Sequence, residues 1–145
     1  MNYTEQFKNI ESKKVLIIGD VMVDSYIWGN VDRISPEAPV RIVSTTKTEN
    51  RLGGAANVVK NINALGLEPI LCSVIGSDAS GEILKEILSQ QNITAQGCIT
   101  SPGRITTTKT RVISGNHQIL RIDNEQTDQL DEILTTELRN YHYLR

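Results

Sequence analysis

Apolar residues fall into short continuous runs and helical stripes that alternate along the first two thirds of the chain. Residues 15–18 form a continuous apolar run that ends at Gly19-Asp20, and residues 69–75 form a second such run. Runs of this kind are typical of strands buried on both faces of a parallel sheet. Residues 54–65 carry apolar side chains three or four positions apart, which predicts a helix that Gly66 ends.

A second helical stripe follows the second apolar run. Gly76-Ser77-Asp78 predicts a turn in which Ser77 or Asp78 caps a helix that ends near Asn92. Its apolar stripe consists of Ile83, Leu84, Ile87 and Leu88. Strand, helix, strand and helix therefore alternate, which predicts an α/β fold with right-handed βαβ connections.

Other β-prone segments do not fit this alternation. Residues 25–28 and 40–43 flank residues 32–39, whose two prolines interrupt any regular element. We interpret this part as a small β flap, or lid, inserted at about residues 25–47. Residues 106–113 and 118–122 predict a hairpin around a turn at 114–117. A final helix is expected over residues 128–141, with these residues facing inward: Leu130, Ile133, Leu134 and Leu138.

Composition narrows the class of protein. The chain has 145 residues, 39% of them hydrophobic and 22% charged, with a net charge of −2. These values fit one globular domain and give no sign of a nucleic-acid or membrane partner. Residues 1–13 are a polar N-terminal arm, unlike a secretory signal, and Cys72 and Cys98 lack metal-site spacing, so we expect a cytoplasmic protein. His117 and His142 are too far apart to predict a metal site.

The glycine pair Gly53-Gly54, followed by Asn57, is the strongest candidate for a binding element. Glycines at the start of a helix let a ligand approach bare backbone, and the first-turn N–H groups favour oxygen-rich or anionic partners. The Asn57 amide both donates and accepts hydrogen bonds, which suits a hydroxylated ligand such as a sugar. A tight turn that happens to precede a helix is the alternative.

The motifs and their order resemble the N-terminal half of the ribokinase-like (PfkB) carbohydrate kinases. Within that family the chain resembles the bacterial kinases of D-glycero-β-D-manno-heptose 7-phosphate. Four stretches carry the resemblance: residues 19–24, 33–40, 53–58 and 108–112. Residues 121–123 add a weaker fifth stretch. The resemblance implies that residues 14–145 are a truncated ribokinase-like domain, the N-terminal part of a three-layer α/β/α sheet with a β lid.

The resemblance also implies a sugar site. Asp24, on the first strand in the family's pattern, would bind sugar hydroxyls, and Gly53, Gly54 and Asn57 would line the same pocket. The turn around Gln118 matches the region of another polar contact to the sugar.

Two basic residues add a possible phosphate contact to this site. Lys109 and Arg111 would share one face of a strand and suit a phosphate clamp, with ordinary charges on a solvated edge strand as the alternative. Asp78 is expected to cap a helix rather than contact a ligand.

The catalytic half of the family's pattern is not found in this sequence. No second glycine-rich turn with its aspartate base occurs, nor does a P-loop. The sequence therefore predicts no catalytic residue and no metal ligand. ATP and Mg²⁺ are expected for the complete family enzyme, in a C-terminal half. The chain is then a fragment, a truncated reading frame or one half of a split enzyme.

The functional hypotheses follow from this resemblance and this departure. The first is a kinase, or its substrate-binding half, that transfers phosphate from ATP to the anomeric hydroxyl of heptose 7-phosphate in ADP-heptose and lipopolysaccharide biosynthesis. The alternatives are an inactive sugar-phosphate-binding or interaction fragment and a kinase for another sugar. A dinucleotide-binding oxidoreductase is disfavoured because no Gly-x-Gly-x-x-Gly follows the first strand.

Two macromolecular partners are expected. One is a complementary C-terminal half, which would cover a sheet edge that is otherwise unpaired. The other is a second copy, paired through apolar residues of the lid strands: Tyr26, Ile27, Trp28, Val40 and Ile42.

Overall fold

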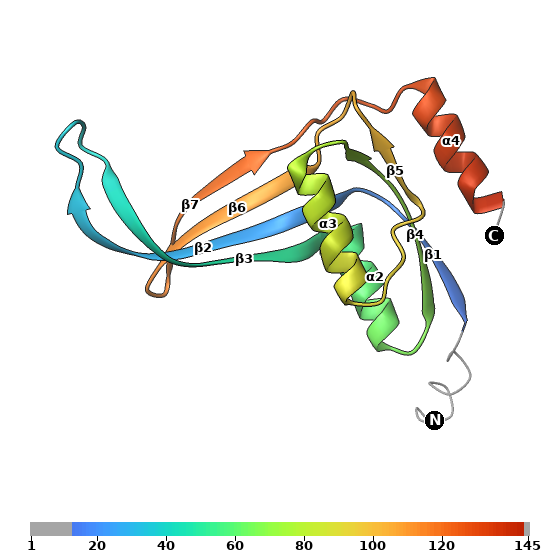
Figure 1. The fold of residues 1–145 in the computed structure, drawn as a ribbon, viewed down its shortest axis with the longest axis horizontal. Coiled ribbons are helices and arrows are strands. Elements are labelled where there is room, and N and C mark those ends of the chain that lie inside the picture. Colours follow the sequence, from blue (N-terminus) through green and yellow to red (C-terminus); the bar gives the residue numbers. More distant parts are fainter. Residues whose placement is uncertain (1–12, 144–145) are drawn as a thin grey trace.

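Two β-sheets divide the molecule into a body that carries the helices and a projecting arm (Figure 1). The computed structural model describes residues 13–143, so the predicted arm at residues 1–13 lies almost wholly outside the described residues. The body sheet is parallel, in the order β1-β4-β5. Its strands are β1 (Lys14–Ile18), β4 (Glu68–Gly76) and β5 (Cys98–Ser101). The α/β prediction is confirmed, although the short β5 was missed.

Helices lie on both sides of the body sheet. Figure 1 shows α2 (Ala55–Ala64) and α3 (Ala79–Gln90) on one side and α4 (Glu132–Tyr143) on the other. The arrangement is the three-layer order that was predicted. The core lies between the sheet and the first two helices, where these side chains are almost fully buried: Val59, Leu71, Ile75, Leu84 and Leu88. Each buried aliphatic side chain of this size contributes about 1.5–3 kcal/mol.

The arm is a mixed four-stranded sheet in the order β3-β2-β6-β7. Its strands are β2 (Val21–Ile34), β3 (Arg41–Gly54), β6 (Thr107–Ser114) and β7 (His117–Asn124). Strands β2 and β6 are parallel, and the other neighbours are antiparallel. This sheet is the predicted lid, but it is larger than residues 25–47 because β2 and β3 have 14 residues each. Beyond Gly29, β2 and β3 continue as a two-stranded ribbon to the turn at residues 35–39.

The boundaries of α2 and α3 follow the predicted caps, whereas α4 begins at Glu132 rather than at residue 128. Gly66 has a φ of 81° directly after Leu65, the C-cap of α2, and the Asp78 side chain accepts a hydrogen bond from the Gly81 N–H at 2.8 Å. Three residues of the apolar stripes are exposed: Val58 by 46%, Leu65 by 49% and Ile133 by 77%. The inward prediction is therefore wrong for Ile133, although its neighbour Leu134 is buried as predicted.

Asp78 also joins the body to the arm. Its Oδ2 accepts a hydrogen bond from the Thr106 N–H at 2.7 Å, and the Gly76 N–H donates to Thr106 Oγ1 at 3.0 Å. Burial opposes ionisation of Asp78, but the hydrogen bonds from Thr106 and Gly81 outweigh it and lower the pKa of the carboxyl. The carboxylate therefore fixes the start of β6, and with it the position of the lid strands, against the first turn of α3.

Candidate functional site

Asp24 lies on one face of the lid strand β2, two residues beyond Met22 and near the end of the strand that joins the body. Its cross-strand neighbours are Arg51 on β3 and Lys109 on β6. Arg111 Nη1 donates a hydrogen bond to Asp24 Oδ1 at 2.5 Å, and both side chains are about one quarter exposed or less. This hydrogen bond raises the pKa of Arg111 above its ordinary value. The structure corrects the expectation that Asp24 belongs to the first strand, which ends at Ile18.

The glycine pair fits around this carboxylate and a neighbouring carbonyl. A Cβ on Gly53 would lie 2.6 Å from Asp24 Oδ2, and a Cβ on Gly54 would lie 2.3 Å from the Asp20 carbonyl oxygen. Gly54 also has a φ of 56°, which favours glycine. The Ala55 N–H donates to the same Asp20 oxygen at 2.9 Å. Gly53 therefore leaves room for Asp24, and Gly54 lets the start of α2 approach the end of β1.

The Lys109 ammonium group is held by two carboxylates, those of Asp123 on β7 and of Glu125 directly after that strand. Its Nζ lies 2.8 Å from Glu125 Oε2 and 3.2 Å from Asp123 Oδ2. The hydrogen bonds that Lys109 donates to Glu125 and, second, to Asp123 raise the pKa of Lys109. Arg121 Nε donates to the other Asp123 oxygen at 2.9 Å. Because β6 lies between β2 and β7, the alternative of an edge strand is wrong. Lys109 and Arg111 share one face as predicted, but each is already paired with acidic groups.

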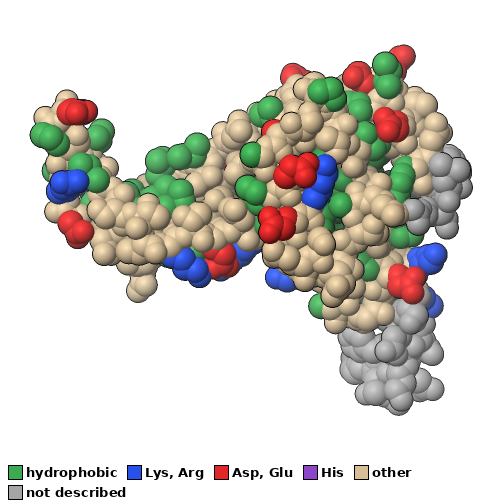
Figure 2. Space-filling model, viewed as in Figure 1, with side chains coloured by type: hydrophobic (Ala, Val, Ile, Leu, Met, Phe, Trp, Pro, Cys, Tyr) green, Lys and Arg blue, Asp and Glu red, His purple; other side chains and the backbone are tan. Residues whose placement is uncertain are grey.

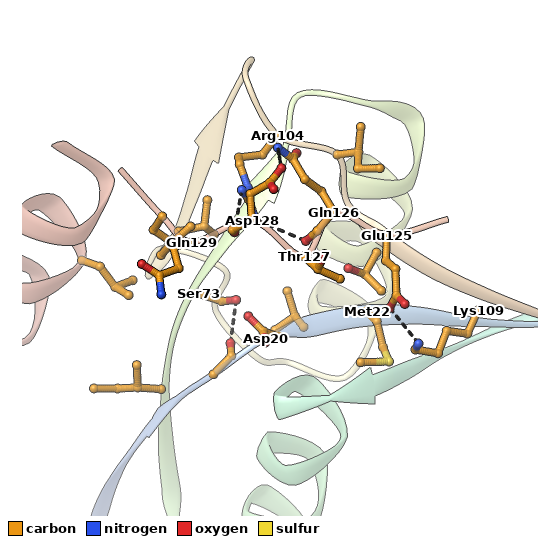
Figure 3. A pocket seen from close by; sticks show the side chains of 18 residues that line it. Asp20, Met22, Ser73, Arg104, Lys109, Glu125, Gln126, Thr127, Asp128 and Gln129 are labelled. Carbon is orange, nitrogen blue, oxygen red and sulfur yellow. Dashed lines mark hydrogen bonds and ion pairs between the residues drawn. The ribbon is translucent and has the colours of Figure 1, made fainter. Parts of the chain in front are cut away.

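A cavity of about 590 Å³ opens where the body meets this face of the lid. Figure 3 shows Lys109 and Glu125 at one end of it, near Met22, with Asp20 and Ser73 further along. Met22 precedes Asp24 by two residues on the same face, so the cavity reaches the row that contains Asp24 without Asp24 lining it.

Residues 126–128 form another wall of the cavity. Arg104 holds this segment by donating to the carbonyl oxygens of Asp128, at 3.1 Å, and Gln126, at 3.4 Å. Sequence reasoning missed this wall because it is a polar connection with no motif.

Gln118 and Asn57 are not part of the ion-paired cluster around Asp24. Gln118 pairs with Ile113, four residues along β6 from Lys109, which corresponds to roughly 13 Å of strand. It is an exposed residue at the far end of β7, so the structure does not bring it to Asp24. Asn57 is exposed in the first turn of α2, three residues after Gly54.

Aromatic and basic side chains extend the same face of the lid away from the body. Tyr26 and Trp28 are stacked with ring centroids 5.5 Å apart. The Arg51 and Arg111 guanidinium carbons lie 4.6 and 5.3 Å from the centre of the Tyr26 ring. Lys47 lies over the Trp28 ring at 4.8 Å. In Figure 2, basic and acidic side chains gather along the β3 edge of the arm. Sequence reasoning missed Arg51, whose role depends on cross-strand register.

Among residues 13–143, no group of three or more His, Cys, Asp or Glu side chains could hold a metal ion. None of the helices in this part of the chain is long and apolar enough to cross a membrane.

The fold and the site define the class: an α/β domain of the ribokinase type whose β lid presents a polar face beside the body. The sequence profile of the pfkB family carbohydrate kinases matches residues 12–144. The chain belongs to the pfkB family of carbohydrate kinases, as its motifs predicted.

Individual relatives agree with this assignment. The chain is 46% identical over 124 residues to the bifunctional protein HldE of Geotalea uraniireducens, covering 86% of the chain and 25% of that protein. Its fold is similar to a carbohydrate kinase from Agrobacterium tumefaciens (TM-score 0.58, 23% identity, 77% of this chain and 35% of that one). It is also similar to a ribokinase from Cryptococcus neoformans in complex with ADP (TM-score 0.57, 20% identity, 78% and 34%). The chain thus spans about a quarter of the length of its curated relatives.

Proposed function

We propose that this chain is the sugar-binding part of an ATP-dependent kinase that phosphorylates the anomeric hydroxyl of D-glycero-D-manno-heptose 7-phosphate, in the synthesis of ADP-heptose for lipopolysaccharide. Membership of the pfkB family supports a carbohydrate kinase. Relatives called HldE, and the flap stretch at residues 33–40, support a heptose phosphate rather than another sugar.

The observation that carries the proposal is the position of the Asp24 carboxylate. One of its oxygens lies against Gly53, the residue that precedes Gly54 and the start of α2, and the Met22 side chain packs beside the same glycine. An ionised carboxylate accepts strong hydrogen bonds from hydroxyl groups, and two vicinal hydroxyls can share it. We assign the sugar to the space between Asp24 and the first turn of α2, with Gly54 and Asn57 on its second side.

The phosphate of the substrate is assigned to Lys109. This ammonium group lies at the lid end of the cavity, in the same cross-strand row as Asp24. A bound phosphate would replace Glu125 and Asp123 as its partner, and the exposed Glu125 side chain can move away to allow this. Gln118 stays a predicted sugar contact that would require the lid to bend toward the ligand.

Phosphoryl transfer is assigned to a complementary C-terminal half that binds ATP and Mg²⁺, present as a continuation of the chain or as a separate one. The outer edge of β1 supports this proposal. β1 is an outermost strand of the described body sheet, and its side chains Leu16 and Ile18 are 41% and 57% exposed. A further parallel strand with its helix would pair this edge and cover these side chains.

The unbridged Cys72 and Cys98 fit a reducing cytoplasm.

A homodimer through the lid is the second proposed assembly. The apolar residues predicted to form the dimer contact do not share one face of the lid, because side chains alternate along a strand. Tyr26 and Trp28 lie on the charged face, whereas Ile27 lies on the opposite face. On that opposite face Leu120 and Ile122 of β7 are each 52% exposed. We expect Leu120→Lys to shift sedimentation equilibrium toward the monomer. A wild-type chain that stays monomeric at all concentrations would contradict the dimer.

Calorimetric titration with heptose 7-phosphate tests the proposed function. Asp24→Asn should weaken binding by roughly 10–100-fold, the effect of losing a charge-assisted hydrogen bond. Asp32→Asn is the matched control, because Asp32 is an exposed aspartate further along β2. Asn57→Ala should weaken binding more than Asn63→Ala, since both are exposed asparagines of α2 and only Asn57 lies in its first turn. Equal affinities for each variant and its control would exclude this site.

A further inference from the structure

The two oxygens of the Asp24 carboxylate have different surroundings. Oδ1 accepts the hydrogen bond from Arg111 Nη1 at 2.5 Å. Oδ2 lies against Gly53, close enough that a Cβ there would be 2.6 Å away. A carboxylate gripped at one oxygen cannot turn freely about its terminal bond. The second oxygen therefore has a defined direction, toward Gly53 of β3 and beside the Met22 side chain.

Arg111 is itself held in place on three sides. Its guanidinium carbon lies 5.3 Å from the centre of the Tyr26 ring, within the range of a cation–π interaction. Its Nη1 also lies 3.5 Å from the Lys109 carbonyl oxygen. Arg51 contacts the same ring at 4.6 Å from the β3 side, so Tyr26 lies between two guanidinium groups. A planar guanidinium that is both stacked and hydrogen-bonded is a rigid support.

This geometry separates the roles of the two basic residues of β6. Lys109 pairs with Glu125 and Asp123, and neither of these carboxylates belongs to the Asp24–Arg111 ion pair. The Arg111 Nη1 group already donates to Asp24, so a phosphate bound at this group would compete with the carboxylate that the sugar needs. A phosphate clamp that used this donor would thus weaken the sugar contact each time it formed.

We propose that Arg111 is a positioning residue for Asp24, holding Oδ1 so that Oδ2 is the oxygen presented to the hydroxyl groups of the ligand. The inference rests on the proposed function, in which Asp24 binds a sugar. It replaces the predicted phosphate contact of Arg111, and it leaves Lys109 as the residue that recognises the phosphate.

Binding measurements separate positioning from phosphate recognition. Arg111→Met should weaken binding of heptose 7-phosphate and of the same heptose without phosphate by an equal factor, roughly 10–100-fold. Arg111→Lys should recover part of this loss. Asp24→Asn with Arg111→Met should bind no more weakly than Asp24→Asn alone, because the support has no function without its carboxylate.

Arg121→Met is the matched control for these measurements. Arg121 lies directly opposite Arg111 on the same face but pairs with Asp123 rather than Asp24, so its loss should leave the affinity for the unphosphorylated heptose unchanged. A loss in Arg111→Met that is confined to the phosphorylated sugar would overturn the proposal, and so would additive effects of the two substitutions.

A second measurement needs no ligand. In a ¹⁵N NMR spectrum of the guanidinium groups, a held Arg111 should show separate Nη signals, which merge in Asp24→Asn but persist in Asp32→Asn. A single averaged signal in the wild-type chain would overturn the positioning role, whatever the sugar does. Separate signals in a chain that binds neither sugar would keep the Arg111–Asp24 unit and reject the proposed function instead.

Discussion

Substituting Gly53 by alanine tests whether the absence of a side chain at this position makes room for the Asp24 carboxylate. The new Cβ would lie 2.6 Å from Asp24 Oδ2 and 2.6 Å from Met22 Cγ, in a buried position of β3. Overpacking of this kind costs about 1–3 kcal/mol. Alanine also restricts the unfolded chain, which stabilises the protein by about 0.4–1 kcal/mol. Gly103→Ala provides this second effect alone, because its nearest neighbour, Ser101 Oγ, would be 3.8 Å from the Cβ.

Equilibrium urea denaturation followed by circular dichroism measures both free energies of unfolding. Gly53→Ala should be about 1–3 kcal/mol less stable than Gly103→Ala, the overpacking cost with the unfolded-state effect cancelled. Adding Asp24→Ala removes one of the two side chains that the Cβ meets, the other being Met22. The double variant should therefore be more stable than the sum of the two single effects predicts. Equal stability of the two glycine variants, or additivity within about 0.5 kcal/mol, would refute this reasoning.

Three further predictions address the neighbouring features. Gly54→Ala should lower the free energy of unfolding by about 1–3 kcal/mol, because it forces a side chain into a φ of 56° beside the Asp20 carbonyl; an unchanged urea midpoint would contradict this. Asp78→Asn should lower the free energy of unfolding above pH 4. It should also make this free energy fall less steeply at acid pH, because a lowered folded-state pKa gives stability that is lost only as pH falls through that pKa. The pKa of the Glu49 carboxyl is about 2 because Arg51 and Lys47 donate to it; in Arg51→Met it should rise toward its ordinary value of 4.5 and stay below it, because Lys47 still donates, and ¹³C NMR measures this change.

Local sequence signals were sufficient where an element is stabilised by its own residues. The stripe of α3, its Asp78 cap and the glycine after α2 are all local features, and the structure confirms them. The lid strands were predicted too short because polar residues such as Asp24, Asn30 and Asp32 break the apolar pattern of β2. One face of that strand is a charged surface, so hydrophobicity alone does not show its length.

The ion pairs of the site could not be predicted because they depend on long-range register. Asp24 and Arg111 are 87 residues apart and meet only because β2 and β6 pair in parallel. A shift of that register by one residue would move Arg111 to the other face of the sheet. The sequence therefore predicted that Lys109 and Arg111 share a face, but not that each already has an acidic partner.

The central claim is that a sugar phosphate binds between Asp24 and the glycine pair, and amide shift mapping tests it most directly. On titration of the ¹⁵N-labelled chain with heptose 7-phosphate, the largest shifts should occur at Gly53, Gly54 and Asp24 and should be absent in Asp24→Asn. Shifts confined to the far end of the cavity, around residues 126–129, or no shifts at all, would contradict the account.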